Sequence, residues 1–152
     1  MRRIVLCVVL IGFGFYSSST APARARQGST PASQIYRGLE INVTGLERAS
    51  STTLTDCPPN ANVVKGMTRG AEEFAIVTVK MKVLPDYKPA PLKRPVLTDA
   101  ADKTYNTAAS FVDLEKVTEF SCKFPFRVPK DTNVKSLHIE TVSFDLTPLP
   151  AK

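Results

Sequence analysis

The stretch that most constrains the fold is 120–128, where apolar and polar residues alternate without a break. One phase of the alternation holds Phe120, Cys122, Phe124, Phe126 and Val128, and the other holds Ser121, Lys123, Pro125 and Arg127. Because successive side chains of a β-strand point to opposite faces, this period separates one apolar face from one polar face. The pattern predicts a core strand of a layered β-domain.

A second strong strand is predicted at 74–84, where Val77, Val79 and Met81 would face the core. Phe74 and Ile76 fall in the opposite phase, which indicates either a bulge or a start that is covered on both faces. Another strand is predicted to begin at residue 39 and end near residue 45.

The rest of the chain alternates turn signals with short apolar segments. Residues 96–98 and 103–105 flank an Asp-rich turn and predict a hairpin, and 137–146 predicts a last strand with a bulge near 140–141. Residues 111–117 fit a short helix or an edge strand. We expect a long loop at 49–70, with room for a short strand at 62–65, and an extended crossing at 85–95, which contains four prolines. Several strands separated by turns predict an all-β, antiparallel β-sandwich.

The first 25 residues are typical of a secretory signal peptide. Arg2 and Arg3 precede an apolar run at 4–16, and two Ala-x-Ala triplets end at Ala23 and Ala25. The run is shorter than the roughly 18–20 residues that a membrane-spanning helix needs. We therefore predict cleavage after Ala23 or Ala25, a flexible arm at 26–34, a domain at 35–148, and a secreted or periplasmic product without stable membrane insertion.

The net charge of the predicted mature chain is small. Of the 20 basic residues, Arg2, Arg3 and Arg24 lie in the leader, so 17 remain against 14 acidic residues, a charge of +3. A charge of this size does not indicate a nucleic-acid-binding protein.

Two cysteines, Cys57 and Cys122, remain after the leader is removed. In an oxidising compartment such a pair normally closes. The alternatives are two free thiols or a redox or metal site, but the chain has no Cys-x-x-Cys motif and a single histidine. We predict a structural disulfide that closes a loop of roughly 65 residues and stabilises the fold by roughly 4 kcal/mol.

Four features in chain order carry a family resemblance: the strand at 74–83, a Leu97-x-Asp99-x-x-x-Lys103-x-Tyr105 hairpin, a strand closing in Val128-Pro-Lys-Asp131, and a Leu137-x-Ile139 strand. Together they resemble a bacterial family of exported immunoglobulin-like domains of unknown function, often mislabelled "telomeric repeat-binding factor 2". Its fold is similar to that of the secreted mycobacterial immunoprotective antigen. The chain departs from the family in having Ala101 or Asp102 where members usually have Gly, and in lacking a lipobox. The resemblance covers about 39–146 and implies an immunoglobulin-like sandwich without a settled activity.

We predict no catalytic site, metal or cofactor. His138 lies between two apolar strand residues and should face outward, and the spacing indicates no Ser/His/Asp arrangement. Asp99 and Asp102, with Asn106, offer oxygens to a hard cation, but their spacing does not match an EF-hand and Asp is common in turns.

Lys80 and Lys82 share the outward face of one predicted strand, and Lys123 and Arg127 share that of another. If the two strands are neighbours, these four residues form a basic face that could dock an acidic envelope polymer or protein. The alternative is that exposed lysines only discourage edge pairing.

We therefore expect a monomeric, exported, non-catalytic binding or interaction module whose partner is an envelope or extracellular protein or polymer. The alternative is a hydrolase or small-ligand carrier with a pocket between the sheets. Nucleic acid is not an expected partner.

Overall fold

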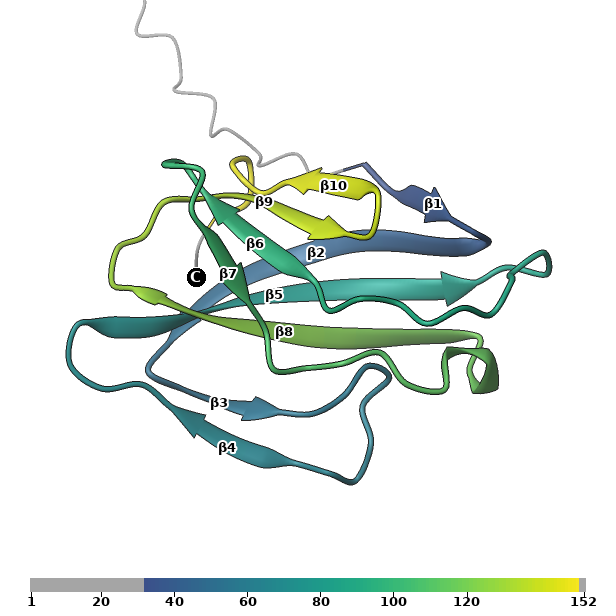
Figure 1. The fold of residues 1–152 in the computed structure, drawn as a ribbon, viewed down its shortest axis with the longest axis horizontal. Helices are drawn as coiled ribbons and strands as arrows, with labels where there is room; N and C mark the ends of the chain where they lie inside the picture. The colour runs from purple at the N-terminus through teal and green to yellow at the C-terminus, as the bar shows by residue number, and fades with distance from the viewer. Residues whose placement is uncertain (1–31, 151–152) are drawn as a thin grey trace, which may run out of the picture.

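The computed structural model describes residues 32–150, in which the chain forms ten β-strands and a single 3₁₀ turn (Figure 1). One sheet has the order β1 (Gln34–Tyr36), β2 (Leu39–Ala49), β5 (Glu72–Val83) and β8 (Glu119–Pro129). A second sheet has the order β10 (Val142–Asp145), β9 (Val134–Ile139), β6 (Val96–Asp99) and β7 (Thr104–Asn106). β3 (Ser51–Leu54) and β4 (Val64–Met67) form a separate hairpin, and the 3₁₀ turn η1 spans Leu114–Lys116. The predicted signal peptide and most of the predicted flexible arm lie outside the described residues.

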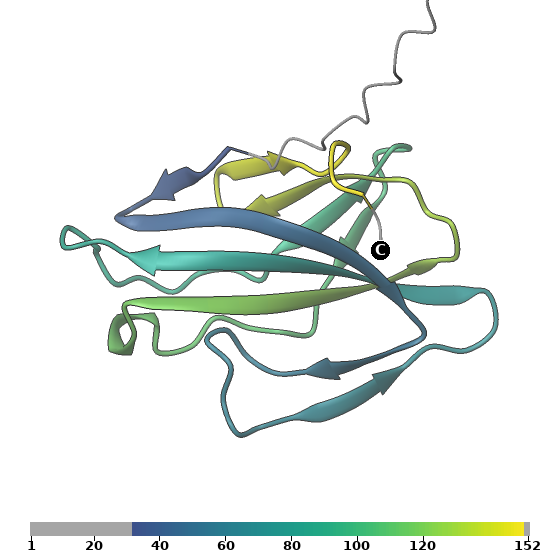
Figure 2. The same cartoon turned by 180° about the vertical axis from the view of Figure 1, so that it is seen from behind.

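The two four-stranded sheets pack face to face, and every strand pair within them is antiparallel. Figures 1 and 2 show them as two layers. Phe124 and Phe126 of β8 are completely buried in one cluster with Leu137 and Ile139 of β9. The alternation at 120–128 explains this arrangement, because the face of β8 that carries Phe124 and Phe126 is favourably removed from water when it packs against the second sheet. The prediction of an all-β sandwich is confirmed.

The prediction that the first strand ends near residue 45 is wrong, because β2 continues to Ala49. Its register against β5 shifts between Val43 and Gly45. The extra residue changes the phase of the strand, so that Val43 and Leu46 can both point into the core.

The prediction of one last strand with a bulge is also wrong, because 137–146 forms a hairpin. β9 ends at Ile139, β10 begins at Val142, and these two residues pair directly. Glu140 in the turn has φ 53°, a left-handed conformation suited to reversing the chain. The change of phase in the sequence is therefore a reversal of direction, which places Phe144 opposite Leu137 on the buried face.

The segment predicted as a long loop contains the β3–β4 hairpin. We call residues 50–71 the arm, which is a different segment from the flexible arm predicted at 26–34. Part of the arm lies on the outer face of the first sheet: a Cβ added to Gly66 would meet the ring of Phe74 at 3.2 Å and the side chain of Leu54 at 3.4 Å. Phe74 and Ile76 are consequently only 4% exposed although they point away from the sandwich core. The out-of-phase start of the second predicted strand is thus a covered face, and its pairing with β8 shows no register shift.

The arm is attached to the sandwich by the predicted disulfide. Cys57 is bonded to Cys122 of β8, with their Cα atoms 5.5 Å apart. The backbone of Cys57 also donates to the Ser110 carbonyl at 2.8 Å and accepts from the Val112 amide at 2.9 Å. One residue therefore holds the arm both covalently and through two hydrogen bonds.

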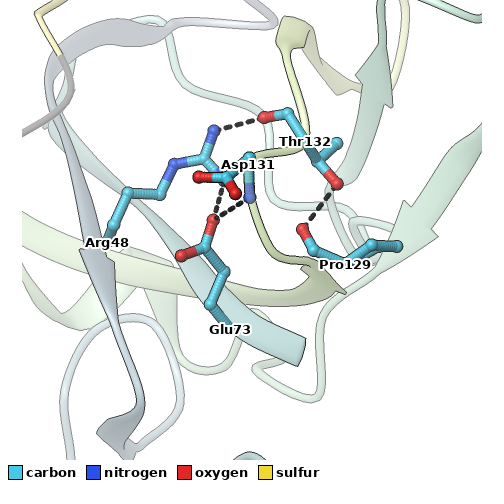
Figure 3. Close-up of polar contacts among 5 residues, drawn as sticks. All are labelled: Arg48, Glu73, Pro129, Asp131 and Thr132. Atoms are coloured by element: carbon cyan, nitrogen blue, oxygen red, sulfur yellow. Dashed lines mark hydrogen bonds and ion pairs between the residues drawn. The ribbon is translucent and has the colours of Figure 1, made fainter. Parts of the chain in front are cut away.

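A half-buried ion pair closes one end of the sandwich (Figure 3). Arg48 and Glu73 continue the inward faces of β2 and β5 beyond the last core residues, and their side chains, 20% and 19% exposed, meet at 2.9 Å. Arg48 also donates to the Thr132 carbonyl at 2.6 Å, and the Asp131 amide donates to Glu73 at 3.2 Å. The pair thereby fixes the turn between β8 and β9, in which the Thr132 hydroxyl donates to the Pro129 carbonyl.

Candidate binding surfaces

Three of the four large apolar side chains that are most exposed among residues 32–150 lie on the arm. Val63, Val64 and Met67 are 56%, 62% and 71% exposed, and among residues 32–150 the other large hydrophobic residue exposed to this degree is Ile35. We call these three residues the arm surface. Figures 1 and 2 both show β4 as the outermost strand, with β3 between it and β8.

The outer edge of β4 has backbone groups that no described strand pairs. The Thr68 amide donates to the Ser50 carbonyl at 2.9 Å, so residues 64, 66 and 68 direct their backbone groups toward β3. The alternate residues, Lys65 and Met67, direct theirs to the free edge. The Met67 carbonyl there accepts from the Arg127 guanidinium at 3.2 Å.

Hydrogen bonds hold the base of the arm. The Asn60 side-chain amide donates to the Asp56 carboxylate at 3.0 Å, and the Ser110 amide donates to the same carboxylate at 3.3 Å. The Asn60 amide also donates to the Thr55 hydroxyl at 3.2 Å. With the Cys57 disulfide, these bonds present the arm surface on a fixed base, which reduces the entropy lost on binding.

The four residues of the predicted basic face all lie on the outer face of β5 and β8, which are neighbours. Lys80 pairs with Glu119, Lys123 with Glu47 at 3.2 Å, and Arg127 with Glu72 at 3.8 Å. Lys82 lies between Glu40 and Glu119 in the register of the sheet.

Each of the four cations on this face thus has a carboxylate beside it, and the face is charge-balanced. A hydrogen bond from Lys80 holds the pKa of Glu119 below its ordinary value, and the same bond raises the pKa of Lys80. An acidic polymer is attracted by a net positive potential, and the neighbouring carboxylates reduce that potential on the predicted basic face. Binding there stays a prediction.

The outer face of the second sheet has a polar hollow of about 480 Å³. Ser136 and His138 of β9 line it, and the Ser136 hydroxyl lies 2.9 Å from Nε2 of His138. Sequence reasoning placed His138 on an outward face but missed Ser136 as its partner. Their spacing of two residues on a predicted strand was the available signal.

A nucleophilic triad needs a serine and a histidine within hydrogen-bond distance, and it also needs an acid on the other ring nitrogen and oxyanion donors. Asp145 lies opposite Ser136 in the sheet, but its Oδ1 accepts from the amide and hydroxyl of Thr147, at 2.9 and 2.8 Å. β9 is paired on both sides, with β6 and β10, so its backbone amides donate to the neighbouring strands and are not free to act as oxyanion donors.

The Asp-rich turn of the predicted hairpin has a structural explanation. The Asp99 carboxylate accepts from the amides of Ala101 and Lys103, both at 2.9 Å, and from the Tyr105 hydroxyl at 2.8 Å. Burial raises the pKa of Asp99, but these hydrogen bonds outweigh burial and hold it below its ordinary value. Asp102 instead pairs with Lys135 at 2.8 Å. Within residues 32–150, no group of three or more His, Cys, Asp or Glu side chains is arranged to hold a metal ion.

No helix in the described part of the chain is long and apolar enough to cross a membrane. No protein-family model matches the chain, and no curated protein matches it. Among solved structures, the chain is similar to an uncharacterised β-sandwich protein from Clostridium difficile 630, with a TM-score of 0.47 and 9% sequence identity over 76% of this chain and 89% of that one.

Proposed function

We propose that the protein is an exported, non-catalytic interaction module of the immunoglobulin-like type, and that it docks an envelope or extracellular partner on the arm surface. The single observation that carries the proposal is the exposure of three large apolar side chains, Val63, Val64 and Met67, in and directly before β4, the outermost strand of a disulfide-tethered hairpin.

Two physical properties of the arm support this proposal. Clustered exposed apolar side chains are costly in water and mark interaction sites in soluble proteins. Apart from the Met67 carbonyl, which accepts from Arg127, the outer edge of β4 has backbone groups that no described strand pairs. Such an edge accepts an added strand from a partner, whose side chains then contact alternate residues along it. β4 contains one charged residue, Lys65, so a partner segment with apolar and acidic side chains would suit it.

Export and family membership are parts of the same proposal. The closed disulfide is compatible with an oxidising compartment, and the leader pattern at 1–25 supports secretion. The order of strand and hairpin motifs supports the resemblance to exported immunoglobulin-like domains.

The test is to capture partners from envelope and medium fractions of the cells that make the protein. Met67→Glu is the variant, and Ile35→Glu, 63% exposed on β1, is the matched control. We expect Met67→Glu to lose the partners captured by the wild type and Ile35→Glu to keep them, with both variants unfolding at the wild-type temperature. Equal capture by Met67→Glu and wild type would reject the arm surface.

One observation favours a second candidate, a serine hydrolase: the hydrogen bond between Ser136 and His138 in the polar hollow. A fluorophosphonate probe distinguishes the two candidates. Labelling that disappears in Ser136→Ala would favour the hydrolase, whereas the interaction module predicts no label that depends on Ser136.

A further inference from the structure

A cleft of about 320 Å³ lies between the two connections that pass from one sheet to the other. One connection is the proline-rich crossing from β5 to β6, which contributes Tyr87 and Leu92. The other leads from β7 to β8 and contributes Phe111, Asp113 and Glu115, beside η1. In Figure 1 both connections run at the same end of β5 and β8.

Each wall of the cleft is fixed to the sandwich. On the crossing, the Leu84 amide donates to the Gly38 carbonyl at 2.8 Å. Gly38 has φ 80°, and a Cβ at this position would lie 2.5 Å from the backbone of Tyr87. Only glycine allows so close an approach, so the crossing is held directly against the turn between β1 and β2.

The opposite wall is held by the disulfide region. Cys57 bonds both Ser110 and Val112 through its backbone, and between them Phe111 packs edge-on against Phe124 with ring centroids 5.4 Å apart. A cleft with both walls fixed in this way is preformed, so a ligand would not have to order it.

The lining combines apolar surface with negative charge. Tyr87, Leu92 and Phe111 supply aromatic and aliphatic surface, and both charged residues in the lining, Asp113 and Glu115, are carboxylates. Asp113 is paired with Lys116 at 2.9 Å. Burial and, second to it, the Glu115 carboxylate raise the pKa of Tyr87, while the Ala90 backbone and the Arg37 cation act in the opposite direction.

We propose that this cleft binds a small organic cation, an ammonium group on an apolar stem. The ammonium would lie at Glu115 beside the Tyr87 ring, because a carboxylate and an aromatic face both attract a cation. The stem would lie against Leu92 and Phe111. The cleft volume is at the lower end of the range for small-molecule sites, which limits the ligand to a compact molecule. This site does not depend on the arm surface.

The experiment is a titration of the ¹⁵N-labelled domain with hexylamine, hexanol and hexanoate, followed by amide chemical shifts. Hexylamine should shift amides at 87–92 and 111–115 and bind about two- to fivefold more tightly than hexanol, the range for an exposed charge pair. Hexanoate should bind more weakly than hexanol.

Glu115→Gln should abolish the preference for hexylamine over hexanol. Glu47→Gln, which removes a carboxylate on β2 that does not line the cleft, should leave it unchanged. Equal binding of hexylamine and hexanol to the wild type, shifts that map away from the cleft, or a preference that survives in Glu115→Gln would overturn the proposal.

Discussion

Replacing both disulfide cysteines with alanine, Cys57→Ala together with Cys122→Ala, should destabilise the fold strongly. The bond links residues 65 positions apart. In the chain-entropy model, closing a loop of this length in the unfolded chain stabilises the folded state by about 4 kcal/mol. That is a large fraction of the roughly 5–15 kcal/mol that separates folded from unfolded domains.

The structure also indicates what survives the substitution. The hydrogen bonds of the Cys57 backbone with Ser110 and Val112 do not involve sulfur and can persist. The sandwich core should therefore remain folded, while the amides of the arm exchange with solvent faster than in the wild type.

Guanidinium unfolding followed by circular dichroism measures the effect. We expect the free energy of unfolding to fall by about 3–4 kcal/mol, and the dependence on denaturant to steepen because the unfolded chain becomes less compact. Wild type treated with a reductant is the control and should match the double variant. A loss below about 1 kcal/mol would refute the reasoning, because the tether would then constrain the unfolded chain far less than its length requires.

Three further predictions concern single features. Arg48→Ala should destabilise the domain by about 1–2 kcal/mol in thermal unfolding, since it leaves Glu73 half-buried without its cation, and no change would contradict this. Because the folded-state pKa of Asp99 is lowered, its ionised carboxylate stabilises the fold fully above an unfolded-state pKa of about 4, and this stabilisation is lost as the pH falls through the folded-state pKa. Asp99→Asn should therefore make the unfolding temperature depend less on pH between pH 2 and 6 than in the wild type. The same fall in unfolding temperature at acid pH in both proteins would contradict this prediction. Lys80→Ala with Lys82→Ala should leave capture of anionic envelope polymers nearly unchanged, because the face is charge-balanced, whereas a salt-sensitive loss would restore the predicted basic face.

The strands that could be predicted from sequence are those with one buried face. In β8, alternation separates core from solvent at every position from Ser121 to Val128 except Pro125, which is buried in the outward phase, and Cys122 lies in the inward phase. The cysteine pair was predictable because the pattern at 1–25 predicts export to an oxidising compartment, and two cysteines remain outside that segment.

What the sequence did not reveal depends on contacts between distant segments. The arm hairpin covers Phe74, so a strand start that is apolar on both faces cannot be interpreted without knowing what packs above it. A change of phase near Glu140 fits a bulge or a reversal equally well, and only the pairing of Ile139 with Val142 decides between them. The charge balance around Lys80 likewise arises from a neighbouring strand, because Glu119 becomes its partner only once β5 and β8 are adjacent.

The arm surface is the central functional claim, and site-specific photo-crosslinking tests it most directly. A benzophenone amino acid is placed at Val64 on the arm or, for comparison, at Ile35 on β1, both of which are exposed. After irradiation in envelope fractions, position 64 should crosslink to one dominant partner that position 35 does not capture. Crosslinks from position 35 alone, or the same products from both positions, would contradict the account.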